Sequence, residues 1–330
     1  MRRNLFFLAL VCMNFSTVVP LSYTGKKITY EDKILCLGSC FAVNIGEKFK
    51  AYQFQQTINP FGILFHPKAI EKLVEYAVNG YTFTVEDVFE HQEIWSSFVA
   101  HSDMNELEQE DIVTKLNVKL FDLQLALRES TFITLTFGTA WVYELKTTGE
   151  IVANCHKVPN TQFDKRLLSY TEVVASYQNM LRLIRGVNKE AHILCSISPV
   201  RHTKDGFVEN QRSKSILLAA LHEALASLQD TKMNYIPVYE MMMDELRDYR
   251  FYTEDLIHPN AIAIQYIWER FVAHYIDEEM YAVMKKVDEV QKGLNHRPFN
   301  PTAEQHMKFL DTLIEKIDDL LERYPFMNFR

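Results

Sequence analysis

The clearest pattern in the sequence is an alternation of short apolar runs with stretches whose apolar residues recur every three or four positions. Residues 34–37 form one such run and end at Gly38, and from Phe41 to Phe49 every fourth residue is apolar, as on one face of a helix. The pattern therefore predicts a strand, a tight turn and a helix in this order.

The same alternation continues to about residue 275, and no repeat or linker-like segment interrupts it. Strands separated by helices imply a mostly parallel sheet with helices on both faces, so we expect one α/β domain over residues 31–275. The predicted strands are 131–137, 192–198 and 235–239, with a hairpin of 141–145 and 151–153; the predicted helices are 67–79, 120–127, 173–184, 213–228 and 259–271.

Residues 276–330 have a different pattern, with two helical stretches at 278–290 and 304–324. We interpret them as a helical C-terminal extension that packs on the sheet domain. The alternative is an arm that forms a homodimer, because oligomers often use such additions.

Residues 1–30 are expected to be a leader outside the domain. Arg2 and Arg3 precede an apolar run at 5–11, as in a signal peptide, but no small-residue cleavage site follows and the run is too short to span a bilayer. Two hypotheses remain for residues 1–12: a start codon placed too early, with Met13 as the true start and a cytoplasmic protein, or a genuine export signal.

Composition excludes several classes of partner. The 330 residues are 48% hydrophobic and 24% charged with a formal net charge of -8, which argues against nucleic acid or an anionic membrane as the main partner. The sequence has neither a phosphate-binding G-x-x-x-x-G-K-[ST] nor a dinucleotide-binding G-x-G-x-x-G motif, and its His and Cys residues lack metal-ligand spacing. We therefore expect no metal and no cofactor.

Reactive side chains cluster where ligands of parallel sheets bind, directly after strands. In the first cluster Gly38 allows a sharp turn, and Ser39 and Cys40 then lie at a helix N-terminus, whose free N–H groups can stabilise a thiolate or an oxyanion. The other clusters are 138–140, 198–202 and 255–259.

The spacing of Asp255 and His258 suits a base and its orienting carboxylate. Across a short turn the Asp can accept a proton from one imidazole nitrogen, which fixes the tautomer and leaves the other nitrogen as base. In the alternative interpretation Asp255 merely caps a helix that begins at Pro259.

These segments also carry a family resemblance. The run at 34–42 resembles the motif of the GSCFA family, which is grouped with the SGNH/GDSL-like hydrolases, and the segments 59–62, 137–141, 198–202, 248–252 and 255–259 resemble it in the same order. The resemblance extends from about Asn14 to the C-terminus. It implies a flavodoxin-like three-layer α/β/α fold with a mostly parallel sheet.

The resemblance also implies residue roles. SGNH enzymes have Gly-Asp-Ser after the first strand, with the Ser as nucleophile, so Cys40 takes the nucleophile position and Ser39 the Asp position. Ser39 is the second choice, if the turn is offset by one residue, and His258 and Asp255 become base and orienter. The alternative is that Cys40 is a packed small residue and Ser39 a helix cap.

The oxyanion donors are less clear, because Ala140 stands where superfamily members have a donating Asn. The resemblance implies the backbone N–H groups of Cys40 and Gly62 as donors. Asn59, Thr139 and Asn154 are the candidates to substitute for the missing Asn, and the sequence does not choose among them. The candidate oxyanion and substrate-binding residues are Gly38, Asn59, Gly62, Gly138, Thr139, Asn154, Arg201 and His202, of which Arg201 and His202 suit a substrate carboxylate or phosphate.

The leading hypothesis is thus a hydrolase or acyltransferase for an ester or thioester of a small molecule or carbohydrate, by analogy with the superfamily. A catalytically inactive SGNH-fold binding module is the alternative, favoured by Ala140 and the altered first motif. A third hypothesis is an interaction protein that acts through its C-terminal helices.

Overall fold

The computed structural model describes residues 17–329, and within this range five parallel strands form the central sheet in the order β10-β9-β5-β1-β2. Counted along this sheet alone, the order is the 2-1-3-4-5 arrangement of flavodoxin-like folds, so the expected α/β class is confirmed. The strands are β1 (Lys33–Gly38), β2 (Gln55–Ile58), β5 (Phe132–Phe137), β9 (His192–Ile197) and β10 (Met233–Tyr235).

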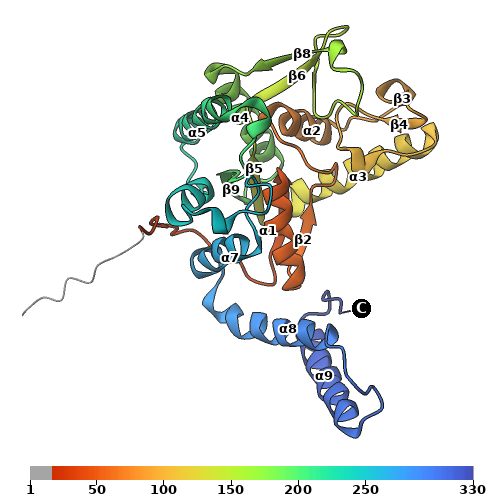
Figure 1. Cartoon of the computed structure of the whole chain (residues 1–330), viewed down its shortest axis with the longest axis vertical. Helices are drawn as coiled ribbons and strands as arrows, with labels where there is room; N and C mark the ends of the chain where they lie inside the picture. The colour runs from red at the N-terminus through yellow and green to blue at the C-terminus, as the bar shows by residue number, and fades with distance from the viewer. Residues whose placement is uncertain (1–16, 330) are drawn as a thin grey trace, which may run out of the picture.

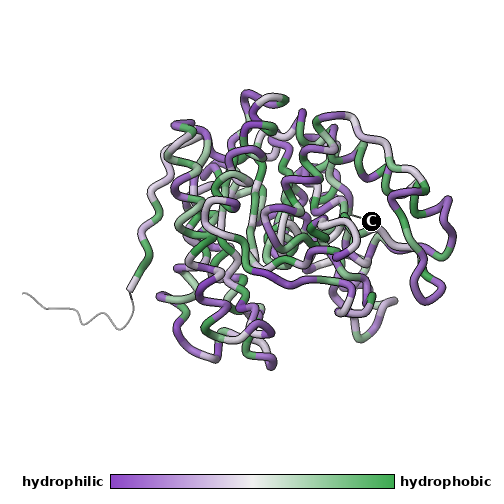
Figure 2. Tube along the Cα trace, turned by 90° about the horizontal axis from the view of Figure 1, so that it is seen from above, coloured by the Kyte–Doolittle hydropathy of each residue, from purple (hydrophilic) through white to green (hydrophobic). Residues whose placement is uncertain are grey.

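Helices cover both faces of this sheet, which explains why its inner strands β1, β5 and β9 are buried along almost their whole length. Figure 2 shows hydrophobic segments in the interior of the fold. In β1, Leu35 and Leu37 join one core and Ile34 and Cys36 the other. The first core contains α2 (Pro67–Asn79), α3 (Gln109–Glu129), α4 (Tyr170–Val187) and α5 (Phe207–Leu228); the second contains α1 (Cys40–Ala51) and α7 (Ala261–Tyr275).

Short antiparallel strands lie at one end of the molecule, at the top of Figure 1. The expected hairpin is confirmed as β6 (Trp141–Leu145) and β7 (Ile151–Val152), and the sequence analysis missed β8 (Phe163–Leu167), which pairs with the other side of β6. A second hairpin, β3 (Phe89–His91) and β4 (Ile94–Ser96), was also missed.

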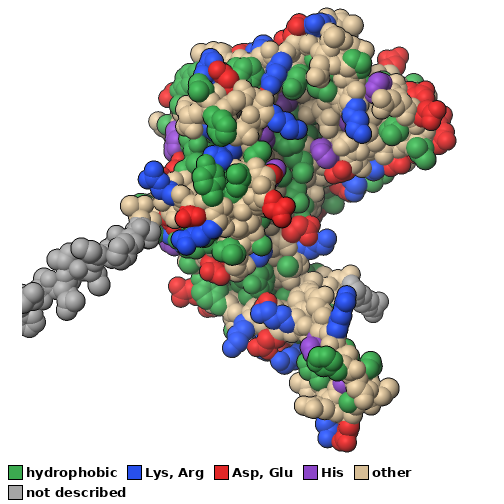
Figure 3. All heavy atoms as spheres, in the orientation of Figure 1, with side chains coloured by type: hydrophobic (Ala, Val, Ile, Leu, Met, Phe, Trp, Pro, Cys, Tyr) green, Lys and Arg blue, Asp and Glu red, His purple; other side chains and the backbone are tan. Residues whose placement is uncertain are grey.

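The C-terminal helices α8 (Tyr281–Leu294) and α9 (Glu304–Arg323) project at the opposite end (Figure 1). Val283 and Val287 of α8 are buried in the core of α1 and α7, and the ring of Tyr324 lies 5.0 Å from that of Tyr30. Acidic and basic side chains are mixed over the surface (Figure 3). Phe299, in the connection between α8 and α9, is fully exposed. Within residues 17–329, no helix is long and apolar enough to cross a membrane.

Some predicted boundaries were wrong. The strand expected at 235–239 ends at Tyr235, and the chain then forms the short helix α6 (Val238–Glu240) and a π-helical turn, because its apolar residues pack equally well on a helix. Helix α7 begins at Ala261 rather than Pro259, since the Asn260 side chain caps it by accepting the N–H groups of Ile262 and Ala263. Helices α3 and α5 begin earlier than expected.

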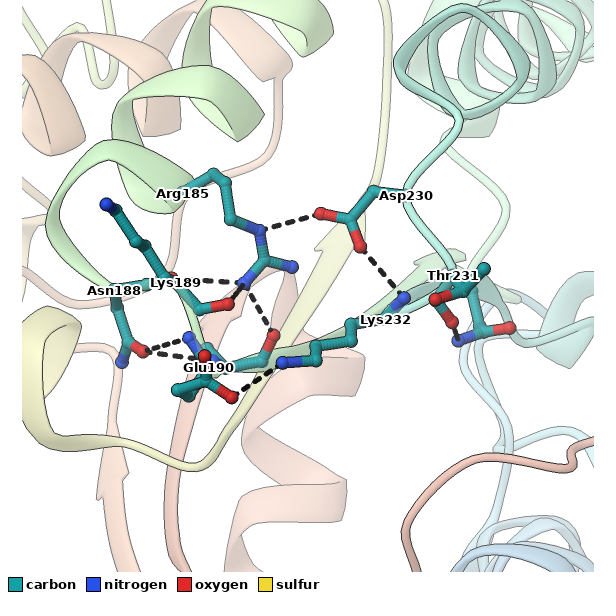
Figure 4. A network of polar contacts seen from close by, with 9 residues as sticks. Arg185, Asn188, Lys189, Glu190, Asp230, Thr231 and Lys232 are labelled. Atoms are coloured by element: carbon teal, nitrogen blue, oxygen red, sulfur yellow. Dashed lines mark hydrogen bonds and ion pairs between the residues drawn. The ribbon is translucent and has the colours of Figure 1, made fainter.

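A polar network closes the sheet edge at which β9 and β10 begin (Figure 4). Asn188 is 9% exposed, and its amide donates to the carbonyls of Leu127, Arg128 and Ser130 and accepts the N–H groups of Glu190 and Ala191. Arg185 binds Asp230 at 2.7 Å beside it. The side chains of Asn188 and Arg185 therefore bond directly to several backbone groups at this edge.

We expect Asn188→Ala to lower the free energy of unfolding by about 2–4 kcal/mol, because it leaves several buried backbone groups without partners. Chemical denaturation measures this change. The matched control is Asn295→Ala at the C-terminal end of α8. The exposed Asn295 amide makes one bond to the Gln291 carbonyl, and its removal should change stability by less than about 0.5 kcal/mol. Equal effects of the two substitutions would contradict the assignment.

Candidate active site

The turn between β1 and α1 is shaped by close packing at Gly38. Its φ is +134°, and a Cβ there would lie 2.1 Å from the carbonyl oxygen of Thr136 in β5. The Ser39 N–H donates to the same oxygen at 3.0 Å. Only glycine fits this close approach, and the turn that results makes Cys40 the first residue of α1.

Cys40 lies at the helix N-terminus, where backbone N–H groups lack helical partners. Burial raises the pKa of its thiol, and the Lys214 charge and the N–H groups of Cys40 and Phe41 lower that pKa in part. Ser39 differs, because it is fully buried and its hydroxyl has no partner among the described residues. Ser39 is the N-cap residue, but its side chain makes no cap bond, so the expected alternative as a side-chain cap is wrong.

Asp255 and His258 form the pair that their spacing predicts. Asp255 Oδ2 lies 2.6 Å from His258 Nδ1, and Oδ1 accepts the Thr253 hydroxyl and the N–H groups of Ile257 and His258. These bonds, with that of Thr253 the strongest, hold the pKa of Asp255 well below its usual range. Because Asn260 caps α7, Asp255 is free for His258, whose Nε2 remains available as a base.

One cavity of about 600 Å³ brings the two groups together at the ends of β1, β5 and β9. Cys40 lines it from α1, and His258 lines it from the loop before α7. Within the described residues, no hydrogen bond joins Cys40 and His258. Ser39, unlike Cys40, does not line the cavity. The arrangement therefore offers an accessible thiol and an oriented imidazole in one hollow of substrate size.

Residues 33–271 match the family model described as the GSCFA family, and residues 287–330 match that of the GSCFA domain protein, C-terminal domain. The chain belongs to the GSCFA family. Among curated proteins, none matches the sequence.

Among solved structures, an acetyl xylan esterase from the rumen bacterium Butyrivibrio proteoclasticus is similar, with a TM-score of 0.33 and 12% sequence identity over 74% of this chain. The match covers 64% of the esterase chain, less than two thirds of its length. At this TM-score the similarity does not indicate a shared activity.

Several of the oxyanion donors that the family resemblance implies are already hydrogen-bonded within the protein. The Gly62 N–H donates to the Asn59 carbonyl, and the Gly138 N–H donates to the Phe65 carbonyl at 2.7 Å. The Asn59 side-chain amide accepts the Gly38 N–H and donates to the Gly38 carbonyl. The N–H groups of Gly62 and Gly138 are thus bonded within the protein, and neither Asn59 nor Gly62 lines the cavity of Cys40 and His258.

Thr139 and Asn154, the other two substitutes for the missing Asn, both line the cavity. The Thr139 hydroxyl contacts Ser213 Oγ at 3.1 Å and accepts the Trp141 N–H. Asn154 Oδ1 accepts the His156 N–H, and its Nδ2 has no partner among residues 17–329. Of these two residues, Asn154 is therefore the one with an unused hydrogen-bond donor that could replace the missing Asn.

Arg201 and His202 also line the cavity, but their polar atoms are not equally available. Arg201 Nη2 donates to the Leu256 carbonyl at 2.7 Å, and its guanidinium carbon lies 5.1 Å from the Tyr252 ring centroid. This contact braces the loop that carries His258. Burial, with the nearby Lys214 charge, lowers the pKa of His202 to about 3, so its imidazole is neutral at pH 7.

The sequence analysis also missed lysines at the site, among them Lys214 and Lys165. Lys214 on α5 is fully buried and donates to the carbonyls of Gly138 and Ser198 at 2.7 Å each. Its position was detectable, because it precedes the buried Leu217 by three residues on the apolar face of α5. Lys165 lies 5.2 Å from the Trp141 ring centroid on the cavity wall. No group of His, Cys, Asp and Glu side chains in the described range is arranged to hold a metal ion.

Gly38→Ala should lower the free energy of unfolding by about 3 kcal/mol or more, because the new methyl group clashes with the Thr136 carbonyl and the φ is unfavourable. Thermal and chemical denaturation test this. Gly186→Ala in α4 is the matched control: nothing described lies within 4 Å of its added Cβ, and we expect a stabilisation of up to about 1 kcal/mol. Wild-type stability of Gly38→Ala would refute the packing argument.

Proposed function

We propose that this GSCFA protein is an SGNH-type hydrolase or acyltransferase that acts on ester or thioester bonds through Cys40, His258 and Asp255. The observation that carries the proposal is the cavity itself: a thiol at a helix N-terminus and an imidazole oriented by a carboxylate line the same hollow. An O-acylated carbohydrate is a suitable substrate, since Trp141, Tyr143 and polar side chains line the wall.

The reaction has two halves. Cys40 Sγ attacks the acyl carbon, and its proton passes to His258 Nε2. The bond to the leaving oxygen or sulfur then breaks and that atom takes the proton, which leaves an acyl-thioester on Cys40. Water or an acceptor hydroxyl attacks this thioester, gives its proton to His258, and restores the thiol. Asp255 holds the imidazole tautomer and stabilises the imidazolium.

The oxyanion is stabilised by the Cys40 N–H at the start of α1 and by Asn154 Nδ2. The helix N-terminus favours negative charge at this position. Asn154 takes the role that superfamily members give to the Asn at the position of Ala140, whose side chain here is buried in the core and donates nothing.

The alternative is an inactive binding module, which the raised pKa of the Cys40 thiol and the lack of a hydrogen bond from it to His258 in the described structure favour. Such a module would use the same cavity for an acyl or carbohydrate ligand without covalent chemistry.

Intact-mass spectrometry after exposure to p-nitrophenyl acetate tests the nucleophile. We expect one acetyl adduct on the wild type and on Ser39→Ala, none on Cys40→Ala, and acylation slowed by about 10²–10⁴-fold in His258→Ala. If the wild type forms no adduct, the binding-module hypothesis replaces the enzyme. If the adduct survives Cys40→Ala and disappears in Ser39→Ala, the nucleophile is Ser39.

Asn154→Ala should lower kcat for the same ester by about 10²–10³-fold with a small change in KM, because its donor is used in the transition state. Asn160→Ala is the control, since Asn160 lines the same cavity and has no assigned role. Parallel losses in the two variants would show a general effect of the cavity wall rather than a specific donor.

A further inference from the structure

The most unusual group near the cavity is a lysine buried without a carboxylate. The Lys214 side chain is fully buried, and its hydrogen-bond acceptors within residues 17–329 are two backbone carbonyls, those of Gly138 and Ser198. These carbonyls follow β5 and β9, the strands that continue the sheet beyond β1. A buried cation is costly unless an anion compensates its charge.

The anion that can form nearby is the Cys40 thiolate. Lys214 Nζ donates to the Gly138 carbonyl at 2.7 Å, and a Cβ at Gly138 would lie 3.5 Å from the Ser39 Cβ, so the ammonium lies beside the turn that carries Cys40. Each of the two charges favours the charged form of the other, and burial lowers the pKa of Lys214 to about 7. The two carbonyls use two N–H groups of Nζ. The third position holds a proton when the amine is charged and a lone pair when it is neutral.

We propose that Lys214 is a positioning residue that holds Cys40 in its reactive form: its ammonium, fixed between the Gly138 and Ser198 carbonyls, stabilises the thiolate through space. The inference rests on the proposed function in taking Cys40 as nucleophile. The lysine touches neither substrate nor the reacting atoms and acts through the charge that it keeps at the end of β5.

Cys40 and Lys214 then titrate as a coupled pair. The first proton leaves either the thiol or the ammonium, and the state with thiolate and ammonium is the nucleophilic one. The other groups around Lys214 are His202, which is neutral near pH 7, and the Tyr239 ring, whose centroid lies 5.7 Å from Nζ. His258 adds to the field at His202 from the opposite loop. None of these groups supplies a negative charge at neutral pH.

The test is the rate of Cys40 alkylation by iodoacetamide between pH 6 and 10, read by peptide mass spectrometry. Lys214→Gln keeps a hydrogen-bond donor and removes the charge, and we expect it to slow alkylation at pH 8 by about ten-fold, which corresponds to one unit of thiol pKa. Lys214→Arg keeps the charge and should restore most of the rate. If the Lys214→Gln profile equals that of the wild type, Lys214 has only a structural role through its two backbone hydrogen bonds, and the proposal is overturned.

Lys48→Gln is the matched control. Lys48 is on the same helix as Cys40, and its ammonium binds Gln265, so removal of its charge should leave the alkylation profile unchanged. An equal slowing in this variant would show a general effect of net charge and would overturn the specific role of Lys214.

A reciprocal measurement does not depend on the folding of a Lys214 variant. Because coupling acts equally in both directions, Cys40→Ala should lower the pKa of Lys214, followed by NMR of protein with ¹³C-labelled lysine. An unchanged Lys214 titration would overturn the coupling. Both measurements need no ester turnover, so they can succeed where the acylation test fails, and the reverse.

Discussion

The contact between Gly38 and the Thr136 carbonyl is the constraint on which the site depends. It lets β1 leave the sheet directly against β5, and the Ser39 N–H then bonds to the same carbonyl oxygen. On the other side of the turn, the Asn59 amide makes two hydrogen bonds to the backbone N–H and carbonyl of Gly38. With the turn held from two neighbouring strands, α1 can begin only at Cys40, and the thiol is delivered to the open edge of the sheet.

The two edges of the sheet differ in how their polar groups are used. At the edge where β9 and β10 begin, the side chains of Asn188 and Arg185 bond directly to backbone groups (Figure 4). At the opposite edge, Arg201 fixes the loop of His258 and Lys214 ties the ends of β5 and β9, yet a cavity remains between these braces. Rigid supports around an open hollow are what a preorganised site requires.

Much of the fold and part of the candidate site were predictable from local sequence patterns. The buried strands are continuous apolar runs, and the Asp255–His258 pair forms within a single turn, so spacing alone indicates it. The oxyanion donors were not predictable, because whether the N–H of Gly62 or Gly138 is free depends on carbonyls that the tertiary structure brings to it. The same holds for Lys214: its helical position predicts burial, but its partners at the ends of β5 and β9 come from segments far apart in the sequence.

A cysteine nucleophile needs both proton transfer and stabilisation of its thiolate, and the positions of His258 and Lys214 assign these two roles to different residues. A proton must leave the thiol and later return to a leaving group, which requires a base in contact with the cavity and with solvent; the His258 side chain is 47% exposed. A nearby positive charge must favour the thiolate while the proton is away, and the Lys214 ammonium, held between the Gly138 and Ser198 carbonyls, supplies this charge from a fully buried position. Burial raises the pKa of the Cys40 thiol and the Lys214 charge lowers it, so the lysine offsets part of the effect of burial when His258 accepts the thiol proton.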